Sequence, residues 1–187
     1  MRSFINKTRN KTVFAILIVG FLLLASCDSL PLACKEKLDR PFWTRVEGEI
    51  DGRAVVAEVY CDGTEHKTKE IYNRCTVTFL EPASLSGITV SLRSDGLATL
   101  RLKDSEEEQP LFGEMIRPYL ALTPIGQLYS QNKNENGYEM TYRQGEDYAT
   151  YYFDESGVPK KVDGRVGNRD FCLNITKFRQ NSNKKIN

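Results

Sequence analysis

Short runs in which apolar and polar residues alternate, separated by tight-turn pairs, are the feature that most constrains the fold of this chain. From Val55 to Cys61 every second residue is apolar, the period of a strand with one buried face. Asp51-Gly52 and Asp95-Gly96 separate such runs, and Asp-Gly is the preferred chemistry of a two-residue hairpin turn. We therefore predict an antiparallel meander of about five strands over residues 45–103, with further strands over residues 138–178.

The apolar period changes to that of a helix between these two groups of strands. Ser105-x-x-Glu108 has the form of a capping box, but Pro110 also suits the first position of a helix, and both starts stay open. Pro118 should break or kink the helix, and Thr123-Pro124 is expected to begin a second short turn. The residues on one stripe, which either join the core or form a ligand lid, are Leu111, Phe112, Met115, Ile116 and Tyr119.

The N-terminus has the three parts of a secretory signal. Four basic residues and no acid precede an apolar run over residues 13–24, which is shorter than the roughly 20 residues of a membrane span. Leu24-Ala25-Ser26-Cys27 then forms a lipobox, in which Cys27 receives the lipid. These features predict a bacterial lipoprotein on the extracytoplasmic face of the cell membrane. We divide the chain into a signal (1–26), a lipid-anchored tether (27–42), a β domain (43–178) and a flexible tail (179–187).

Removal of the signal changes the net charge of the chain. The whole sequence has 26 basic and 25 acidic residues, and the signal carries four of the basic ones. The mature domain therefore has 22 basic against 25 acidic side chains and a net charge of −3. Binding to nucleic acid depends on clustered positive charge, so we predict that nucleic acid is not a partner.

Four cysteines are left once Cys27 carries a lipid, and they allow three disulfide connectivities. Cys61 ends one predicted strand and Cys75 begins the next, so these two residues can be joined across a hairpin. Cys34 and Cys172 would then tie the N-terminal arm to the last strand. Four free thiols are the alternative. A zinc site is disfavoured because the chain has no C-x-x-C pair and a single histidine, His66.

Known catalytic patterns are missing from the sequence. His66 alone cannot supply a catalytic triad or a histidine-based metal site. There is no G-x-S-x-G elbow, no phosphate-binding glycine loop and no H-E-x-x-H motif. We predict that the chain is not an enzyme and uses no cofactor or metal.

Two sequence phrases carry a resemblance to a known family. Residues 151–162 read YYFDESGVPKKV, and residues 76–85 read TVTFLEPASL, completed by Gly87, Ile88 and Val90. The first resembles a strand–turn–strand phrase of the LolA/LolB-like lipoprotein-carrier superfamily. The second is similar to a phrase in lipoproteins of this architecture from Gram-positive spore-formers. The resemblance covers Trp43 to Phe178 and implies a strongly curved antiparallel half-barrel, mainly β, with a few helices packed on its concave side.

The same resemblance implies a binding function for the concave face of the sheet. That face would take a lipid or a lipoprotein acyl chain, and the helical stripe Leu111, Phe112, Met115, Ile116 and Tyr119 would line the site as part of a lid. A sheet too curved for its own side chains to fill leaves room for such a ligand. We predict a membrane-anchored lipoprotein that binds or carries a hydrophobic ligand. The alternative is an interaction module that docks an envelope protein.

Overall fold

The computed structural model describes residues 29–62, 73–93, 97–102, 105–109 and 112–180, without the side chains of residues 29–32, 73 and 112. Two helices and eleven strands lie in these ranges. The helices are α2 (Ser29–Asp39) and α3 (Phe112–Leu120). The strands are β1 (Phe42–Ile50), β2 (Arg53–Cys61), β3 (Asn73–Glu81), β4 (Ile88–Arg93), β5 (Ala98–Leu102), β6 (Ser105–Glu108), β7 (Gln127–Asn134), β8 (Gly137–Gln144), β9 (Asp147–Phe153), β10 (Pro159–Val166) and β11 (Arg169–Gln180).

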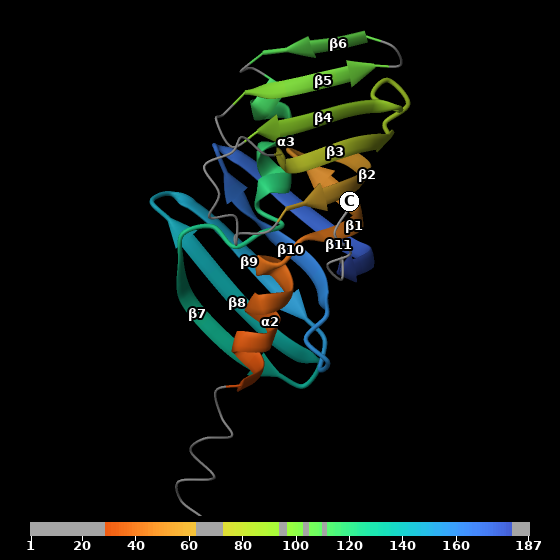
Figure 1. The fold of residues 1–187 in the computed structure, drawn as a ribbon. Coiled ribbons are helices and arrows are strands. Elements are labelled where there is room, and N and C mark those ends of the chain that lie inside the picture. The colour runs from red at the N-terminus through yellow and green to blue at the C-terminus, as the bar shows by residue number, and fades with distance from the viewer. Residues whose placement is uncertain (1–28, 63–72, 94–96, 103–104, 110–111, 181–187) are drawn as a thin grey trace, which may run out of the picture.

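All eleven strands form one antiparallel sheet in the order β6-β5-β4-β3-β2-β1-β11-β10-β9-β8-β7. The predicted mainly β fold is confirmed. The sheet is not closed or strongly curled, so the strong curvature of a half-barrel is absent. The sheet stays open because β6 and β7 lie at its opposite edges and do not pair with each other. Figure 1 shows α2 and α3 in front of the same face of the twisted sheet.

The sheet begins at its centre with the predicted hairpin of β1 and β2. Asp51 and Gly52 connect these strands, with φ angles of 51° and 71°, the left-handed pair that a type I′ turn requires. In β2 the alternate residues Val55, Ala57 and Val59 are buried. The alternation therefore sets the register, because a slip by one residue would move all of these side chains to the outer face.

Residues 29–39 form a helix, where the sequence predicted a tether over 27–42. Cys34 and Leu38 are buried at 0% and 1% exposure, and they are four residues apart, so they lie on one face of α2. Lys37 Nζ donates to the carbonyl of Ser156 at 2.7 Å, and the amide of Gln180 donates to the carbonyl of Lys37 at 3.2 Å. These hydrogen bonds and the burial of Cys34 and Leu38 hold α2 on the sheet. The free energy gained by burial offsets the conformational entropy that residues 29–39 lose when they become ordered.

Both edges of the sheet differ from the predicted structure. Ser105–Glu108 is strand β6, not a capping box, and α3 begins at Phe112, two residues after Pro110. Residues 127–134 form strand β7, where we predicted a turn and a polar loop. These strands have one neighbour each and almost wholly exposed side chains. An edge strand without a buried face lacks the alternation by which strands are recognised in a sequence.

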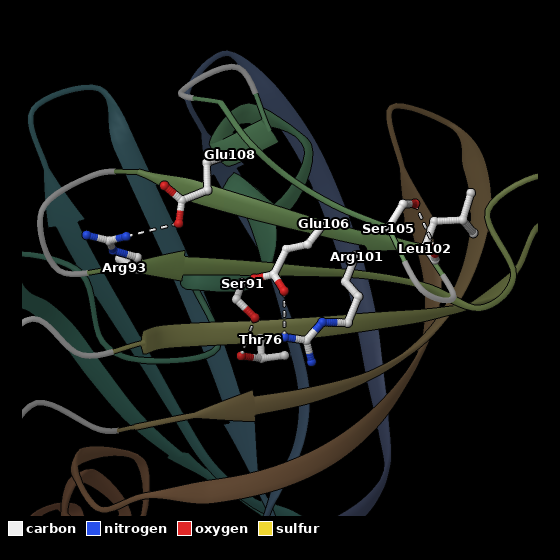
Figure 2. Close-up of polar contacts among 8 residues, drawn as sticks. All are labelled: Thr76, Ser91, Arg93, Arg101, Leu102, Ser105, Glu106 and Glu108. Carbon is white, nitrogen blue, oxygen red and sulfur yellow. Dashed lines mark hydrogen bonds and ion pairs between the residues drawn. The ribbon is translucent and has the colours of Figure 1, made fainter.

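The face of the sheet opposite α3 is polar and carries cross-strand pairs. Figure 2 shows the ion pairs Arg93–Glu108 (3.1 Å) and Arg101–Glu106 (3.0 Å), which join β6 to β4 and to β5. The hydroxyls of Thr76 and Ser91 lie 3.0 Å apart between β3 and β4. This outer face is hydrated, so the apolar residues of the same strands must pack on the inner face beneath the helices.

Candidate functional site

A cavity of about 290 Å³ lies where α3 meets the end of the sheet that holds the β1–β2 turn. Its wall is mainly apolar and includes two basic residues and no acidic residue. The lining residues are Ile50, Arg53, Ala54, Val55, Phe79, Pro82, Ser84, Leu85, Met115, Tyr119 and Arg169. A largely apolar cavity with a few polar groups is the usual form of a small-molecule site.

Helix α3 contributes part of the predicted stripe to this cavity. Met115 and Tyr119 line the cavity, whereas Ile116 is a fully buried core residue at 0% exposure. The stripe therefore divides between the cavity wall and the core. Leu111 lies outside the described residues, and of Phe112 the structure describes the backbone alone. Cys27, the predicted lipid attachment, also lies outside the described residues.

Two turns that are far apart in sequence meet at the cavity and hold Arg169. Arg169 Nε donates to Asp51 Oδ2 at 2.8 Å, and the backbone N–H of Asp170 donates to Asp51 Oδ1 at 3.0 Å. The hydrogen bond from Arg169 is the main reason that the pKa of the Asp51 carboxyl is lowered. Asp51 is therefore charged at neutral pH and fixes the guanidinium of Arg169 beside the cavity.

Pro118 explains a second contact of Arg169. A proline has no N–H, so the carbonyl four residues before it loses its helical donor. Here that carbonyl belongs to Glu114, and Arg169 Nη1 donates to it at 3.2 Å. The helix continues through Pro118 to Leu120, so the predicted break does not occur. Arg169 thus joins α3 to the β10–β11 turn and forms one wall of the cavity.

Arg53 brings a second positive charge to the same cavity. It is the first residue of β2, directly after the Asp51-Gly52 turn, and its side chain is exposed. Within the described residues its guanidinium has no ion pair and no hydrogen bond. Arg169 forms an ion pair with Asp51, and the carboxylate of Glu114 forms an ion pair with Arg117. The mouth of the cavity therefore has one uncompensated positive charge, on Arg53.

Tyr119 places a buried hydroxyl next to this cavity. The residue is 0% exposed, and its ring packs edge-to-face on Phe79, with 5.9 Å between the ring centroids. No described residue forms a hydrogen bond with its hydroxyl. Burial raises the pKa of this phenol, and the nearby charge of Arg169 opposes the shift. A neutral O–H donor without an acceptor is thus held close to Arg169.

The four remaining cysteines are free thiols in this structure. Cys34 on α2 is buried on the inner face, whereas Cys172 is exposed and lies between the buried residues Phe171 and Leu173 of β11. The sheet lies between these two thiols, so the predicted Cys34–Cys172 pair is not formed in this structure and stays a prediction. Cys61 and Cys75 lie directly opposite each other on β2 and β3. Their hydrogen bond and their burial raise the pKa of Cys61.

The described residues contain no cluster of three or more histidine, cysteine, aspartate or glutamate side chains that could hold a metal ion. Among the same residues, no helix has the length and apolar character needed to cross a membrane.

Comparisons with known proteins bear on the fold. No family model and no curated protein matches the chain. It is similar to an uncharacterized conserved protein from Thermus thermophilus (TM-score 0.46, 18% identity, covering 80% of this chain and 84% of that one). It is also similar to a LolA superfamily protein from Nitrosomonas europaea (TM-score 0.39, 12% identity, covering 81% of this chain and 94% of that one). A third similar structure is an outer membrane lipoprotein-sorting protein domain from Vibrio parahaemolyticus (TM-score 0.41, 9% identity, covering 80% of this chain and 88% of that one).

Sequence reasoning missed both arginines of the cavity. Arg53 and Arg169 are 116 residues apart in the chain, and they come together because β1 pairs with both β2 and β11. The one available signal was the position of Arg53, directly after the predicted Asp51-Gly52 turn, whereas no turn was predicted before Arg169. That signal becomes informative when the strand order is known.

Proposed function

We propose that this domain binds a small hydrophobic ligand in the cavity beneath α3, as a lipoprotein held on the membrane by Cys27. The observation that carries the proposal is the partly open cavity of about 290 Å³ with a mainly apolar wall. A concave, largely apolar site with a few polar groups is the usual form of a small-molecule site.

The volume limits the ligand. An engineered cavity of about 150 Å³ accepts benzene, which has six non-hydrogen atoms. A cavity of about 290 Å³ is roughly twice as large and suits a ligand of about twelve non-hydrogen atoms. It therefore matches one short chain, or the end of one longer acyl chain. Two or three full acyl chains would need α3 to move away from the sheet.

An interaction module is the second candidate, favoured by the exposed residues of β7. Leu128 is 45% exposed and Tyr129 is 68% exposed on this edge strand, whose outer backbone groups pair with no other strand of the sheet. An open edge of this kind can accept a strand from another protein. In this case the partner would be an envelope protein, and the cavity would be incidental.

Native mass spectrometry separates the two candidates. The full chain carrying Cys27→Ser, which has no lipid of its own, is purified without detergent and incubated with decan-1-ol. We expect one bound molecule per chain. Met115→Trp fills the cavity and should abolish binding, whereas Glu114→Trp adds the same ring to the exposed face of α3 and should preserve it. Absence of saturable binding to the parent chain would contradict the proposed function and favour the interaction module.

A further inference from the structure

The polar groups of the cavity are gathered around one part of its wall. Arg53 follows the β1–β2 turn and Arg169 follows the β10–β11 turn, and the backbone N–H of Asp51 donates to the carbonyl of Asp170 at 2.9 Å. The charges of both arginines reach the Asp51 carboxyl, where both lower its pKa. Arg53 and Arg169 therefore both line the cavity at the end formed by these turns.

The charge at this end favours a ligand with a single negative charge. No lining residue is acidic, and Asp51 already forms an ion pair with Arg169 at 2.8 Å. Arg53 is left as the uncompensated charge. A monoanion balances it, whereas a dianion such as a phosphate monoester would carry a further unpaired charge into a partly buried place, which is costly.

The guanidinium of Arg53 suits a carboxylate. The planar fork of an arginine fits a carboxylate with two parallel hydrogen bonds. Arg169 adds a second positive charge to the cavity wall, and its Nε and Nη1 already donate to Asp51 and to the carbonyl of Glu114. A carboxylate at this end of the cavity can therefore form its main contact with Arg53.

We propose that the cavity selects a carboxylate-bearing amphiphile of about twelve non-hydrogen atoms, whose carboxylate is bound by Arg53 beside Arg169. Its apolar tail packs against Phe79, Leu85 and Met115. This inference rests on the proposed function, because it names the head group of the same ligand. It makes the domain a receptor for short fatty acids or acyl chains that end in a carboxylate.

The test compares ligands that share one tail. Decanoate, decan-1-ol and decyl phosphate are titrated at pH 7.5 into the full Cys27→Ser chain by isothermal titration calorimetry. We expect decanoate to bind most tightly. Arg53→Gln should weaken decanoate binding about tenfold, the effect of losing one hydrogen bond to a charged group, and leave decanol binding unchanged. Arg143→Gln, on β8 and remote from the cavity, removes the same charge and should change neither affinity.

If neither decanoate nor decanol binds, the proposed function itself fails. If both bind equally well and Arg53→Gln has no effect, the hydrophobic site stands and the carboxylate inference is overturned. Tighter binding of decyl phosphate than of decanoate would also overturn the choice of a monoanion.

Discussion

The two halves of the sheet are each covered by one helix, yet one half is closely filled and the other contains a cavity. α2 lies over the half with β8, β9 and β10, and α3 lies over the half with β3, β4 and β5 (Figure 1). Both halves belong to the same hydrophobic cluster. The two halves also differ in the buried side chains on the inner face of their strands.

Aromatic rings fill the half beneath α2. The ring centroids of Tyr142 and Tyr151 are 5.6 Å apart, and those of Tyr151 and Phe153 are 6.5 Å apart. The Tyr151 hydroxyl donates to the carbonyl of Thr123 at 2.8 Å. Tyr151 is thus both packed and satisfied in its hydrogen bonding, which is the condition for a buried tyrosine to stabilise a core.

Smaller residues form the inner face of the half beneath α3. Val77, Val90 and Ala98 are its fully buried strand residues, and they do not reach as far towards the helix as rings do. Phe79 and Tyr119 supply the two aromatic rings of the cavity wall, and the Tyr119 hydroxyl has no partner among the described residues. Val77, Val90 and Ala98 do not line the cavity, which lies at the end of the sheet that holds the β1–β2 turn.

Removal of a ring from the filled half should have the largest effect on stability. Tyr151→Ala deletes a ring that is 1% exposed and leaves a large void, so we expect a loss of about 3–5 kcal/mol in the free energy of unfolding. Urea unfolding followed by far-UV circular dichroism measures it. Tyr129→Ala, at a ring that is 68% exposed, is the control and should stay within about 0.5 kcal/mol of the parent. Equal losses in both variants would contradict the core assignment.

Equivalent deletions in the two helices sharpen the comparison. Leu38 on α2 is 1% exposed, so Leu38→Ala should cost about 2–5 kcal/mol. Met115 on α3 is half-buried and borders the cavity, so Met115→Ala removes fewer packed contacts and should cost about 1 kcal/mol. The same urea experiment measures both. A Met115→Ala loss as large as that of Leu38→Ala would mean that no cavity lies beneath α3.

Oxidation of Cys61 and Cys75 should join β2 to β3 covalently in the half beneath α3. The N–H of Asp62 donates to the carbonyl of Arg74 at 3.1 Å, which makes residues 62 and 74 a hydrogen-bonded pair. The neighbouring Cys61–Cys75 pair is then of the non-hydrogen-bonded type, with about 4.5 Å between Cα atoms, a separation that a disulfide accepts. We therefore predict that the two thiolates, oxidised by glutathione disulfide, form a bond that stabilises the domain by about 3 kcal/mol.

Non-reducing peptide mapping tests the Cys61–Cys75 pair directly. The oxidised chain should contain one linked peptide pair, and Cys75→Ser should remove it. Alkylation of the native protein should label the exposed Cys172 in both variants. Free thiols at Cys61 and Cys75 after prolonged oxidation of the folded chain would refute the pairing.

The contacts of Asp154 make the stability of the half beneath α2 depend on pH. Its carboxylate accepts hydrogen bonds from the hydroxyl and N–H of Ser156 and from the N–H of Val158, and it forms an ion pair with Lys160 at 3.0 Å. The Ser156 bond is the largest cause of a lowered pKa for Asp154. Because the pKa of this carboxyl is lower in the folded state, its contacts stabilise the fold at pH values above the unfolded pKa of about 3.9. This contribution is lost as the pH falls below that value and the carboxyl becomes protonated.

Asp154→Asn should therefore destabilise the protein by about 1 kcal/mol at pH 7. The difference from the parent should shrink once the pH falls below about 4, as measured by urea midpoints across a pH series. Glu155→Gln, at the exposed neighbouring position, provides the control and should show no such trend. A difference that stays constant down to pH 2 would exclude a role for the charge.

The central part of the fold was predictable because its sequence patterns are local. Asp51-Gly52 identified the first hairpin, and the alternation around it placed Cys61 opposite Cys75. Cys34 and Leu38 share a helical spacing, which could have revealed α2. Strand β7 could not be recognised, because Gln127 to Asn134 buries no residue and so shows no period.

The candidate site was only half predictable. The helical spacing of Met115 and Tyr119 correctly placed them on one face of α3. Arg53 and Arg169 could not be assigned, because their meeting depends on the order of β2, β1 and β11 in the sheet. The size of the cavity depends on how closely the half beneath α3 packs, which no local pattern records.

The two methionines of the described structure allow the central claim to be tested in one measurement. Met115 borders the cavity, and Met140 is buried beneath α2 at 2% exposure. The full Cys27→Ser chain, labelled with ¹³C at its methionine methyl groups, is titrated with decanoate and followed by NMR. We predict that the Met115 signal shifts until saturation while the Met140 signal keeps its position. A shift of Met140 alone, or no shift of Met115 at millimolar decanoate, would contradict a ligand site confined to the half beneath α3.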